Sequence, residues 1–346
     1  MPLIKAAVLT EINKPLEVKK FSAEPLKKGQ VLIKILYSGV CRSQLMEIRG
    51  LRGHDKWLPH LLGHEASGYV IEVGEGVKKV KEGDEVILSW IKSEGLEAEK
   101  IKFEADVGVI NAGPISTFSN YSIISENRLV HKPKELSMRE AMLFGCAIPT
   151  GAGIVINQAK PKSSDSLLIL GMGGIGFSAF IMAIAMGIKK LGVIDINDSK
   201  LKIAKNLGAE FTYNASDPDL KELVFDDLQE GYDLCIESAG LTKTIELGFD
   251  LINKNHGQLF FASHPPHNEK ISLVPHELIS GKKIFGSWGG NVNPDKDIPL
   301  IWDLIRKNET KLSSFIQKEY SLDNINIAFE DLEDGKVLRP LIVMEH

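Results

Sequence analysis

The stretch Leu167–Asp195 constrains this chain most, because it reads as one complete strand–turn–helix–strand unit. The apolar run Leu167–Leu170 predicts a buried parallel strand, and Leu191–Ile194 predicts a second one. Between them, Gly171-Met172-Gly173-Gly174-Ile175-Gly176 leads directly into an unbroken helical pattern. The G-x-G-x-x-G pattern alone would be weak, but in this setting it predicts a dinucleotide-binding βαβ unit.

The glycines of this motif have separate physical roles. Gly171 permits the tight turn, Gly173 lets the backbone approach a pyrophosphate, and Gly176 lets the helix pack closely on the strand. The free N–H groups and the dipole of the new helix then hold the phosphates. Asp195 follows Gly176 by 19 residues, at the end of the second strand. Its carboxylate would accept from both ribose hydroxyls and repel a 2′-phosphate, so we expect NAD rather than NADP. The alternative is an ordinary α/β unit with a glycine-rich turn.

The whole chain has the length and composition of a two-domain globular protein. Its 346 residues can bury two cores, and 43% hydrophobic with 25% charged residues is the usual balance. A net charge of −5 without a long basic run argues against nucleic acid or an anionic membrane as the main partner. No signal-peptide pattern begins the sequence, and the most apolar segment, Phe177–Ile188, is too short for a bilayer. We therefore expect a cytoplasmic protein that acts on a small molecule.

The chain has three cysteines, Cys41, Cys146 and Cys235, and no two of them are close in sequence. This excludes a disulfide framework and favours reduced thiols. Cys41, His64 and Cys146 together form a Cys₂His set, which can hold a catalytic zinc and leave its fourth position open. Spacings of 23 and 82 residues are weak evidence, however. Taken singly, each cysteine also reads as a small buried hydrophobe, and His64 as a satisfied polar residue.

Two kinds of pattern divide the chain. Up to residue 147, short β-like runs separated by glycine and proline turns predict an irregular, mostly antiparallel β domain. Within it, the polar segment Ile91–Val109 is expected to be a long surface loop or lobe. From Pro149, strands and helices alternate, which predicts a doubly wound parallel sheet. The tail returns to the first domain, because the sheet is already complete. The predicted domains are 1–147 with 287–346, and 148–286.

Eight motifs carry a resemblance to a known family. In order, they are GVCRSQ, LLGHEASGYVIEVGEGV, KEGDEVI, STFSNY, GCAIPTG, GMGGIG, VIDIN and VLRPLI. They resemble the zinc-dependent alcohol dehydrogenases of the medium-chain dehydrogenase/reductase superfamily, over nearly the whole chain. The resemblance implies an α/β protein in which a GroES-like, mostly-β catalytic domain is interrupted by a Rossmann NAD-binding domain. It also implies hydride transfer between an alcohol and NAD, and a homo-dimer or homo-tetramer paired through the strand Lys283–Ser287.

The resemblance assigns roles position by position. Cys41, His64 and Cys146 match the catalytic zinc ligands, the set that alcohol dehydrogenases use. Ser43 matches the hydroxyl that takes the substrate proton, Glu65 a carboxylate behind the zinc, and Thr150 a threonine near the nicotinamide. The positions that match cofactor-binding residues are Arg42, Gly171, Gly173, Gly174, Ile175, Gly176, Asp195, Lys200 and Arg339.

Several positions depart from the family pattern. No cysteine occurs in Ile91–Asn111, where relatives often hold a structural zinc, so we expect one catalytic zinc and no structural zinc. Met46 stands where many relatives have the histidine that ends the proton relay. Gln44 replaces a common aspartate beside the metal, which would change zinc affinity and the acidity of bound water.

The expected substrate pocket departs as well. Trp90 replaces a smaller aromatic residue, Ala112 and Gly113 replace bulky apolar ones, and His264 replaces an apolar residue beside the nicotinamide. These changes predict a wide, partly polar site for a polyol, a sugar or an activated sugar, although His264 reads equally as an exposed loop residue. Two other functions stay open: a zinc-free quinone or enoyl reductase of the same superfamily, and a non-catalytic sensor or scaffold that binds NAD(H).

Overall fold

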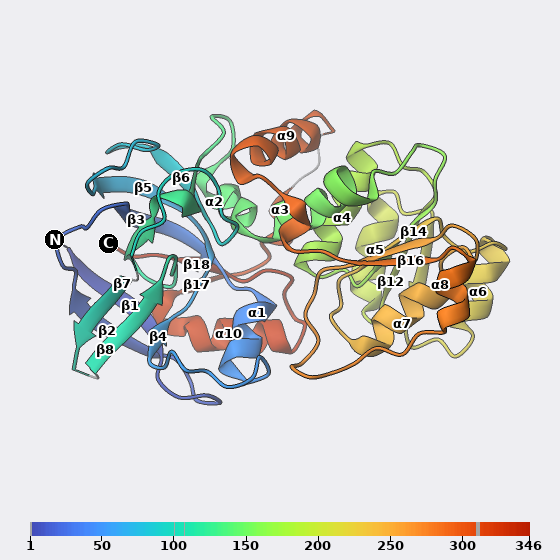
Figure 1. Cartoon of the computed structure of the whole chain (residues 1–346), viewed down its shortest axis with the longest axis horizontal. Coiled ribbons are helices and arrows are strands. Elements are labelled where there is room, and N and C mark those ends of the chain that lie inside the picture. Colours follow the sequence, from blue (N-terminus) through green and yellow to red (C-terminus); the bar gives the residue numbers. More distant parts are fainter. Residues whose placement is uncertain (1, 100, 107, 309–311) are drawn as a thin grey trace. The chain divides into compact units, whose positions relative to one another are not determined.

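The computed structural model describes residues 2–99, 101–106, 108–308 and 312–346 (Figure 1). The chain divides into two compact units. The first comprises Met1–Cys146, Asn293–Trp302 and Lys311–His346, and the second Ala147–Val292 and Asp303–Thr310. The chain thus leaves the first unit one residue before the predicted boundary and returns six residues after it. Helix α9 (Pro294–Lys307) is divided between the two.

The first unit is built on two β-sheets. Its five-stranded sheet has the order β2 (Glu17–Ser22), β1 (Leu3–Leu9), β4 (His60–Leu61), β8 (Gly108–Gly113) and β7 (Ile101–Ala105). The seven-stranded sheet has the order β10 (Leu129–His131), β6 (Glu85–Ser89), β5 (Glu65–Val73), β3 (Gln30–Gly39), β18 (Leu341–Val343) and β17 (Glu319–Ser321), with β9 (Tyr121–Ser125) also paired to β3. Pairing is antiparallel except between β17 and β18 and between β4 and β8, so the predicted class of sheet is confirmed.

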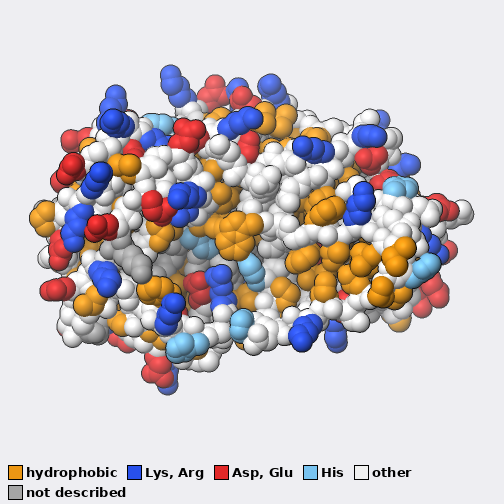
Figure 2. Space-filling model, viewed as in Figure 1, with side chains coloured by type: hydrophobic (Ala, Val, Ile, Leu, Met, Phe, Trp, Pro, Cys, Tyr) orange, Lys and Arg blue, Asp and Glu red, His pale blue; other side chains and the backbone are white. Residues whose placement is uncertain are grey.

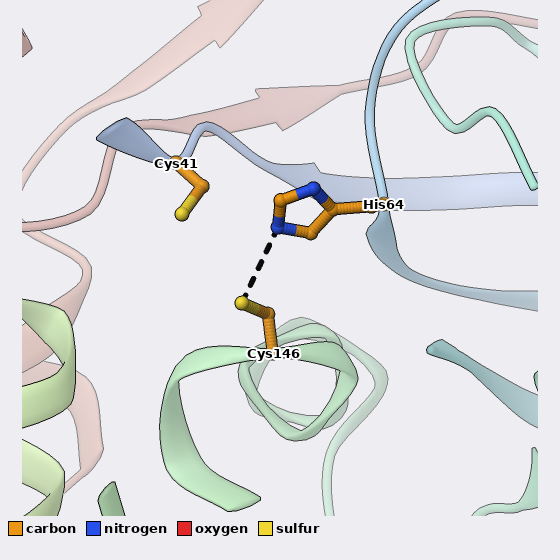
Figure 3. Close-up of side chains that lie close together, drawn as sticks. All are labelled: Cys41, His64 and Cys146. Carbon is orange, nitrogen blue, oxygen red and sulfur yellow. Dashed lines mark hydrogen bonds between the residues drawn. The ribbon is translucent and has the colours of Figure 1, made fainter. Parts of the chain in front are cut away.

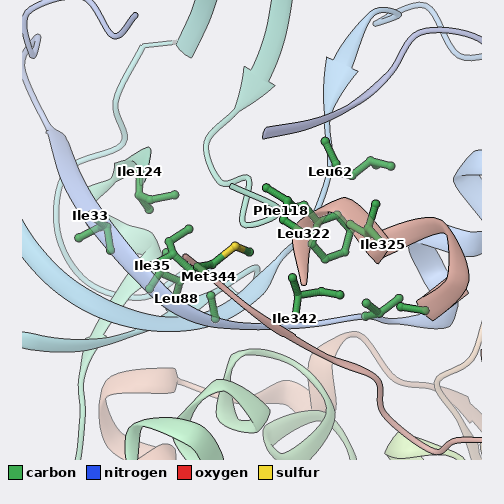
Figure 4. Close-up of a cluster of buried hydrophobic side chains, with 14 of the residues drawn as sticks. Ile33, Ile35, Leu62, Leu88, Phe118, Ile124, Leu322, Ile325, Ile342 and Met344 are labelled. Carbon is green, nitrogen blue, oxygen red and sulfur yellow. The ribbon is translucent and has the colours of Figure 1, made fainter. Parts of the chain in front are cut away.

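Alternate residues of these strands form the main core of the first unit (Figure 4). Ile33 and Ile35 of β3 lie among its buried side chains, together with Ile342 of β18. Leu341 pairs with Gly39, so the last strand of the chain joins the same sheet as β3. Three helices belong wholly to this unit: α1 (Arg42–Ile48), α2 (Met138–Ala141) and α10 (Ile325–Glu333). Short 3₁₀ turns are Glu126–Arg128, Met142–Gly145, Leu312–Phe315 and Leu322–Asn324.

The prediction that Ile91–Val109 is a long surface loop or lobe missed two strands in its second half. That half contains β7 and the start of β8, while residues 100 and 107 lie outside the described part. Ile101 and Phe103 are buried and alternate with exposed charged residues, the period of a half-buried strand. The ring of Phe103 packs on Phe21 of β2, with ring centroids 4.8 Å apart. The many charges of this segment lie on its solvent face, and they concealed the two apolar positions.

The second unit is built on a six-stranded parallel sheet, as predicted. Its order is β13 (Phe211–Asn214), β12 (Leu191–Asp195), β11 (Leu167–Leu170), β14 (Leu234–Glu237), β15 (Gln258–Phe261) and β16 (Lys283–Gly286). The chain starts in the middle of the sheet and reverses direction after β13, so a switch point lies between β11 and β14. The carboxyl ends of these two strands are where such folds bind ligands.

Helices connect the strands of this sheet (Figure 1). They are α3 (Ala147–Gly153) with a π-helical continuation (Ile154–Ala159), α4 (Gly174–Ala185), α5 (Asp198–Leu207), α6 (Leu220–Asp227), α7 (Thr242–Asp250), α8 (Pro275–Ser280) and the 3₁₀ turn Gly289–Asn291. Val224 of α6 and Phe249 of α7 pack on strand residues such as Leu168 and Leu259 in one buried cluster. The doubly wound α/β class predicted for this part of the chain is therefore confirmed.

No single helix in the described ranges is long and apolar enough to cross a membrane. The helices Met138–Gly145 and Ala147–Ala159 meet at a bend. They reach the length and apolar composition of a membrane span only when the two are counted together. Residues 142–155 of that pair are buried inside the structure.

Candidate metal centre and cofactor site

Three side chains of the first unit converge on one point (Figure 3). The ligand atoms of Cys41, His64 and Cys146 all lie within 4.8 Å of one another, and His64 Nε2 lies 3.3 Å from Cys146 Sγ. A tetrahedral zinc with bonds of about 2.0 to 2.3 Å sets its ligand atoms about 3.5 Å apart. Small side-chain rotations reach that spacing, and thiolates with imidazole are the donors that zinc prefers, so these residues fit the metal.

Each of the three residues is placed at the end of an element. Cys41 is the N-cap of α1 and follows β3, whereas His64 directly precedes β5. Cys146 follows the short turn that ends at Gly145. A Cβ on Gly145 would lie 2.4 Å from the carbonyl oxygen of Leu88, so only glycine lets this turn approach the sheet so closely. The packing of the sheet therefore brings together residues that are far apart in sequence.

A buried ion pair lies next to the cluster. Glu65 is fully buried, and its Oε1 lies 3.1 Å from Nη1 of Arg339, which is 3% exposed. The same Nη1 donates to the carbonyl of Val40 at 3.2 Å. Two buried opposite charges held this closely offset each other's desolvation. The guanidinium of Arg339 thus lies beside the carboxylate that was expected behind the zinc.

The thiols are electrostatically coupled. A hydrogen bond from Cys146 holds the pKa of Cys41 well below its usual value against the effect of burial, and Arg339 adds to this lowering. The same hydrogen bond and burial raise the pKa of Cys146. Burial is the largest single effect and lowers the pKa of His64, but the hydrogen bond to Cys41 and the nearby negative charges together outweigh it, so the net shift is upward. The cluster therefore favours one thiolate, the form of cysteine that binds metals.

Gln44 links two of the three candidate ligands. It is 1% exposed and lies in the first turn of α1. Its Oε1 accepts from the backbone N–H of Cys41 at 3.0 Å, and its Nε2 makes a short contact with Nδ1 of His64. Gln44 therefore constrains the orientation of the imidazole through Nδ1, the ring nitrogen opposite Nε2.

Two hydroxyls expected to touch ligands are left without partners. The Oγ of Ser43 and the Oγ1 of Thr150 are both buried, and neither makes a hydrogen bond to any residue in the described ranges. Ser43 is in the first turn of α1 in the first unit, whereas Thr150 belongs to α3 of the second. Because a buried hydroxyl without a partner is costly, each one fits a position that a ligand completes.

A cavity of about 540 Å³ in the first unit has His64 and Gln44 in its wall. Ala112 and Gly113 also line it, and the ring of Trp90 lies edge-on to His64 with centroids 6.4 Å apart. Of the three residues expected to line the substrate pocket in this unit, Ala112 and Gly113 line the cavity, and Trp90 packs against its wall residue His64.

Sequence reasoning missed the polar wall of this cavity. Arg52, Asp55 and His60 line it together with Glu47 and Asn111. His60 Nε2 lies 2.8 Å from Asp55 Oδ2, and Arg52 Nη1 lies 2.6 Å from Glu47 Oε1. The one available signal was the polar run between the two metal motifs, residues 52–56, which no motif or periodicity singled out.

The glycine motif and Asp195 form one site at the carboxyl end of β11 and β12. Asp195 is 8% exposed, its Oδ2 accepts from the backbone N–H of Met172 at 2.7 Å, and its Oδ1 accepts from Asn197 at 2.9 Å. Nζ of Lys200 lies 3.8 Å from Oδ2. The carboxylate is thereby fixed beside the turn between strand and helix, where a dinucleotide would place its adenosine ribose.

The remaining expected residues lie at other places. Arg42 is exposed at the start of α1, and Gly174 and Ile175 begin α4. In the second unit, His264 stacks edge-on to Trp288, with ring centroids 5.8 Å apart. Glu237, which sequence reasoning missed, ends β14; burial raises its pKa, and it accepts from the N–H groups of residues 239 and 240.

Comparison with protein families gives a match in each unit. Residues 27–134 match the alcohol dehydrogenase GroES-like domain, and residues 174–307 match the zinc-binding dehydrogenase domain. The S-(hydroxymethyl)glutathione dehydrogenase of Escherichia coli O6:H1 is 30% identical over 366 residues, which cover 98% of this chain and 99% of that protein. The enzyme of the same name from Synechocystis sp. is 29% identical over 365 residues, with the same coverage.

Solved structures share the whole architecture. A benzyl alcohol dehydrogenase from Acinetobacter calcoaceticus superposes with a TM-score of 0.89 at 25% identity, covering 100% of both chains. An alcohol dehydrogenase zinc-binding domain protein from Burkholderia ambifaria gives 0.91 at 25% identity, also over 100% of both chains.

Proposed function

Because the chain belongs to the zinc-dependent alcohol dehydrogenases of the medium-chain dehydrogenase/reductase superfamily, we propose that it oxidises a bulky, polar alcohol of the polyol or sugar type with NAD⁺. The reaction class is the interconversion of an alcohol with an aldehyde or ketone. The Cys41–His64–Cys146 cluster is the main support for the proposal. Its member His64 lines a cavity with a polar wall.

The residues of the cluster have distinct tasks in this reaction. When bound, zinc supplies Lewis acidity that lowers the pKa of the alcohol, and NAD⁺ accepts hydride from its carbon. Cys41, His64 and Cys146 would hold the metal. Ser43 relays the alcohol proton: its buried Oγ, for which no described residue is a partner, accepts that proton as its own hydroxyl proton passes on toward water. Met46 is buried and carries no proton, so the route onward does not use that side chain.

The second unit binds the cofactor in this proposal. The turn Gly171–Gly176 and the N-terminus of α4 hold the pyrophosphate. Arg42 and Arg339, which the resemblance assigns to the pyrophosphate, belong to the first unit, and Arg339 is paired there with Glu65. Asp195, with Lys200 beside it, accepts from the adenosine ribose, and Thr150 contacts the nicotinamide.

The cavity supports a large and polar substrate. Small residues, Ala112 and Gly113, leave room on one side, and Asp55, His60 and Asn111 offer hydrogen-bonding groups on another. The relatives named above act on S-(hydroxymethyl)glutathione, itself a bulky alcohol with many polar groups, so that compound belongs in the first substrate panel.

The test is NAD⁺ reduction across paired alcohols. We expect higher kcat/KM for polyols, sugar derivatives or S-(hydroxymethyl)glutathione than for ethanol, propanol and hexanol. Ala112→Leu should raise KM for the preferred bulky alcohol about 10-fold or more, while ethanol turnover is retained. Val109→Leu is the matched control, because Val109 lies on the same strand but is 49% exposed. Turnover of short aliphatic alcohols alone would contradict the proposed substrate class.

Zinc content separates this proposal from the two other functions. A zinc-free quinone or enoyl reductase would bind no metal in Cys41, His64 and Cys146 and would reduce quinones or enones with NADPH or NADH. A sensor or scaffold would bind NAD(H) and turn over no alcohol. Elemental analysis of the purified protein, followed by the alcohol panel, distinguishes all three.

We also propose a homo-dimer or homo-tetramer that forms through β16. This strand lies at one edge of the six-stranded sheet. Exposed apolar side chains lie on this strand and on the segment just before it: Phe285 is 40% exposed, Val274 57% and Ile279 83%. Figure 2 shows hydrophobic side chains gathered over this part of the second unit. An unpaired strand edge beside an apolar surface is suited to pairing with a second copy.

The dimer proposal is tested by sedimentation of two matched variants. Ile279→Asp should dissociate the assembly into smaller species, because it places a charge in the apolar patch. The control is Ile327→Asp, which makes the same substitution at an isoleucine of α10 that is 47% exposed. It should leave the assembly intact. A wild-type monomer would contradict the proposal.

A cytoplasmic location is proposed too, since all three cysteines are free thiols.

A further inference from the structure

The side chain of Gln44 provides one hydrogen-bond acceptor where the metal site needs two. Its Oε1 is taken by the backbone N–H of Cys41 at 3.0 Å, and its Nε2 faces Nδ1 of His64. The backbone N–H of Cys41 is always a donor. An amide nitrogen with two hydrogens is also only a donor, so Gln44 favours an Nδ1 that carries no proton.

Zinc requires the other arrangement at His64. Nε2 is the ring nitrogen that faces Cys146 Sγ, so the metal would be bound through Nε2. A neutral histidine bound through Nε2 carries its proton on Nδ1 and donates it to an acceptor. In the observed arrangement this N–H would meet the N–H₂ of Gln44, donor against donor.

Turning the amide of Gln44 over does not remove the conflict. Oε1 would then accept from Nδ1–H, but the N–H of Cys41 would face Nε2 instead. Gln44 is 1% exposed, so the two facing donors would be buried together at a cost in free energy. A carboxylate of the same length would offer one oxygen to each donor.

We infer that Gln44 is a positioning residue that weakens zinc binding by the site, and that Gln44→Glu strengthens it. The inference rests on the proposed zinc site. Partners that orient a metal-bound histidine typically change metal affinity by about 10- to 100-fold, so the gain in Gln44→Glu should fall in that range. Competition for zinc with a chromophoric chelator measures it for both proteins.

A second measurement separates hydrogen bonding from the added charge. In protein labelled with ¹⁵N-histidine and stripped of metal, we expect the nitrogen spectrum of wild-type His64 to show the proton on Nε2. In Gln44→Glu the proton should move to Nδ1. Equal or weaker zinc affinity in Gln44→Glu would overturn the inference, and so would an Nδ1 proton in the wild type, a result that needs no variant to fold. If the wild type bound no zinc at all, the proposed function itself would fail.

Discussion

Asp195 uses both carboxylate oxygens to hold the backbone around the cofactor turn. One oxygen accepts from Met172 and the other from Asn197, so the charge is fixed where an adenosine ribose would lie. The negative charge repels a 2′-phosphate, and the remaining lone pairs accept from ribose hydroxyls. We therefore expect cofactor choice to depend on this one side chain.

Asp195→Ser should change that choice. We expect the ratio of kcat/KM for NAD⁺ to that for NADP⁺ to fall about 10- to 100-fold, since a hydrogen bond to a charged group contributes about 1.5 to 3 kcal/mol. Asp198→Asn is the control, because it removes a charge three residues away, where the side chain bonds to Asn214. An unchanged ratio in Asp195→Ser, with the melting temperature retained, would remove Asp195 from cofactor selection.

Single residues differ in how far the sequence can reveal them. Asp195 was identified from spacing alone, because its strand and helix have strong local periodicity. Cys41, His64 and Cys146 needed the resemblance to a family, since the packing of the sheet and not local sequence brings them together. Asp55 could not be found either way, because a polar loop has no periodicity that shows which side chain lines a cavity.

The strand–turn–helix element separates glycines that serve folding from those that serve the ligand. A Cβ on Gly176 would lie 1.8 Å from the carbonyl oxygen of Gly171 and 2.4 Å from Oγ of Ser238. A Cβ on Gly173 would meet nothing within 4 Å, and its φ of −80° suits any residue. The space beside Gly173 is where a pyrophosphate would lie.

Matched alanine variants test this difference. Gly176→Ala should lower the free energy of unfolding by about 3 kcal/mol, because backbone must move to admit the methyl group. Gly173→Ala should unfold within about 0.5 kcal/mol of wild type, yet raise KM for NAD⁺ about 10-fold by occupying the approach to the pyrophosphate. Urea unfolding and steady-state kinetics measure both. Normal NAD⁺ kinetics in Gly173→Ala would show that this turn does not approach the cofactor.

Elements with one strong period were predictable and those with mixed signals were not. β11 and β12 are continuous apolar runs, which parallel strands buried on both faces require. β7 carries only two buried apolar residues, Ile101 and Phe103, among charged ones, so its segment resembled a loop. β7 pairs with β8, the next strand in the chain, but its buried Phe103 packs on Phe21 of β2, and no local pattern reports that remote contact.

At the scale of the whole molecule, the chain starts and finishes the same unit. β18 pairs with β3 and contributes Ile342 to the main core of this unit, and Met344, directly after the strand, also lies in that core. This return could be predicted from the number of strands, because six strands already complete the parallel sheet. The interruption at residues 303–310 was not predictable, because α9 is one continuous helix that belongs to both units.

We propose that zinc held by Cys41, His64 and Cys146 makes this chain an alcohol dehydrogenase. The most direct measurement is zinc content and alcohol turnover in Cys146→Ala, beside Cys235→Ala as a control that removes a buried thiol from β14 in the other unit. We predict that Cys146→Ala loses both zinc and turnover while still binding NADH, and that Cys235→Ala retains one zinc per chain and its activity. Full turnover or full zinc content in Cys146→Ala would contradict the proposal that this zinc site drives the reaction.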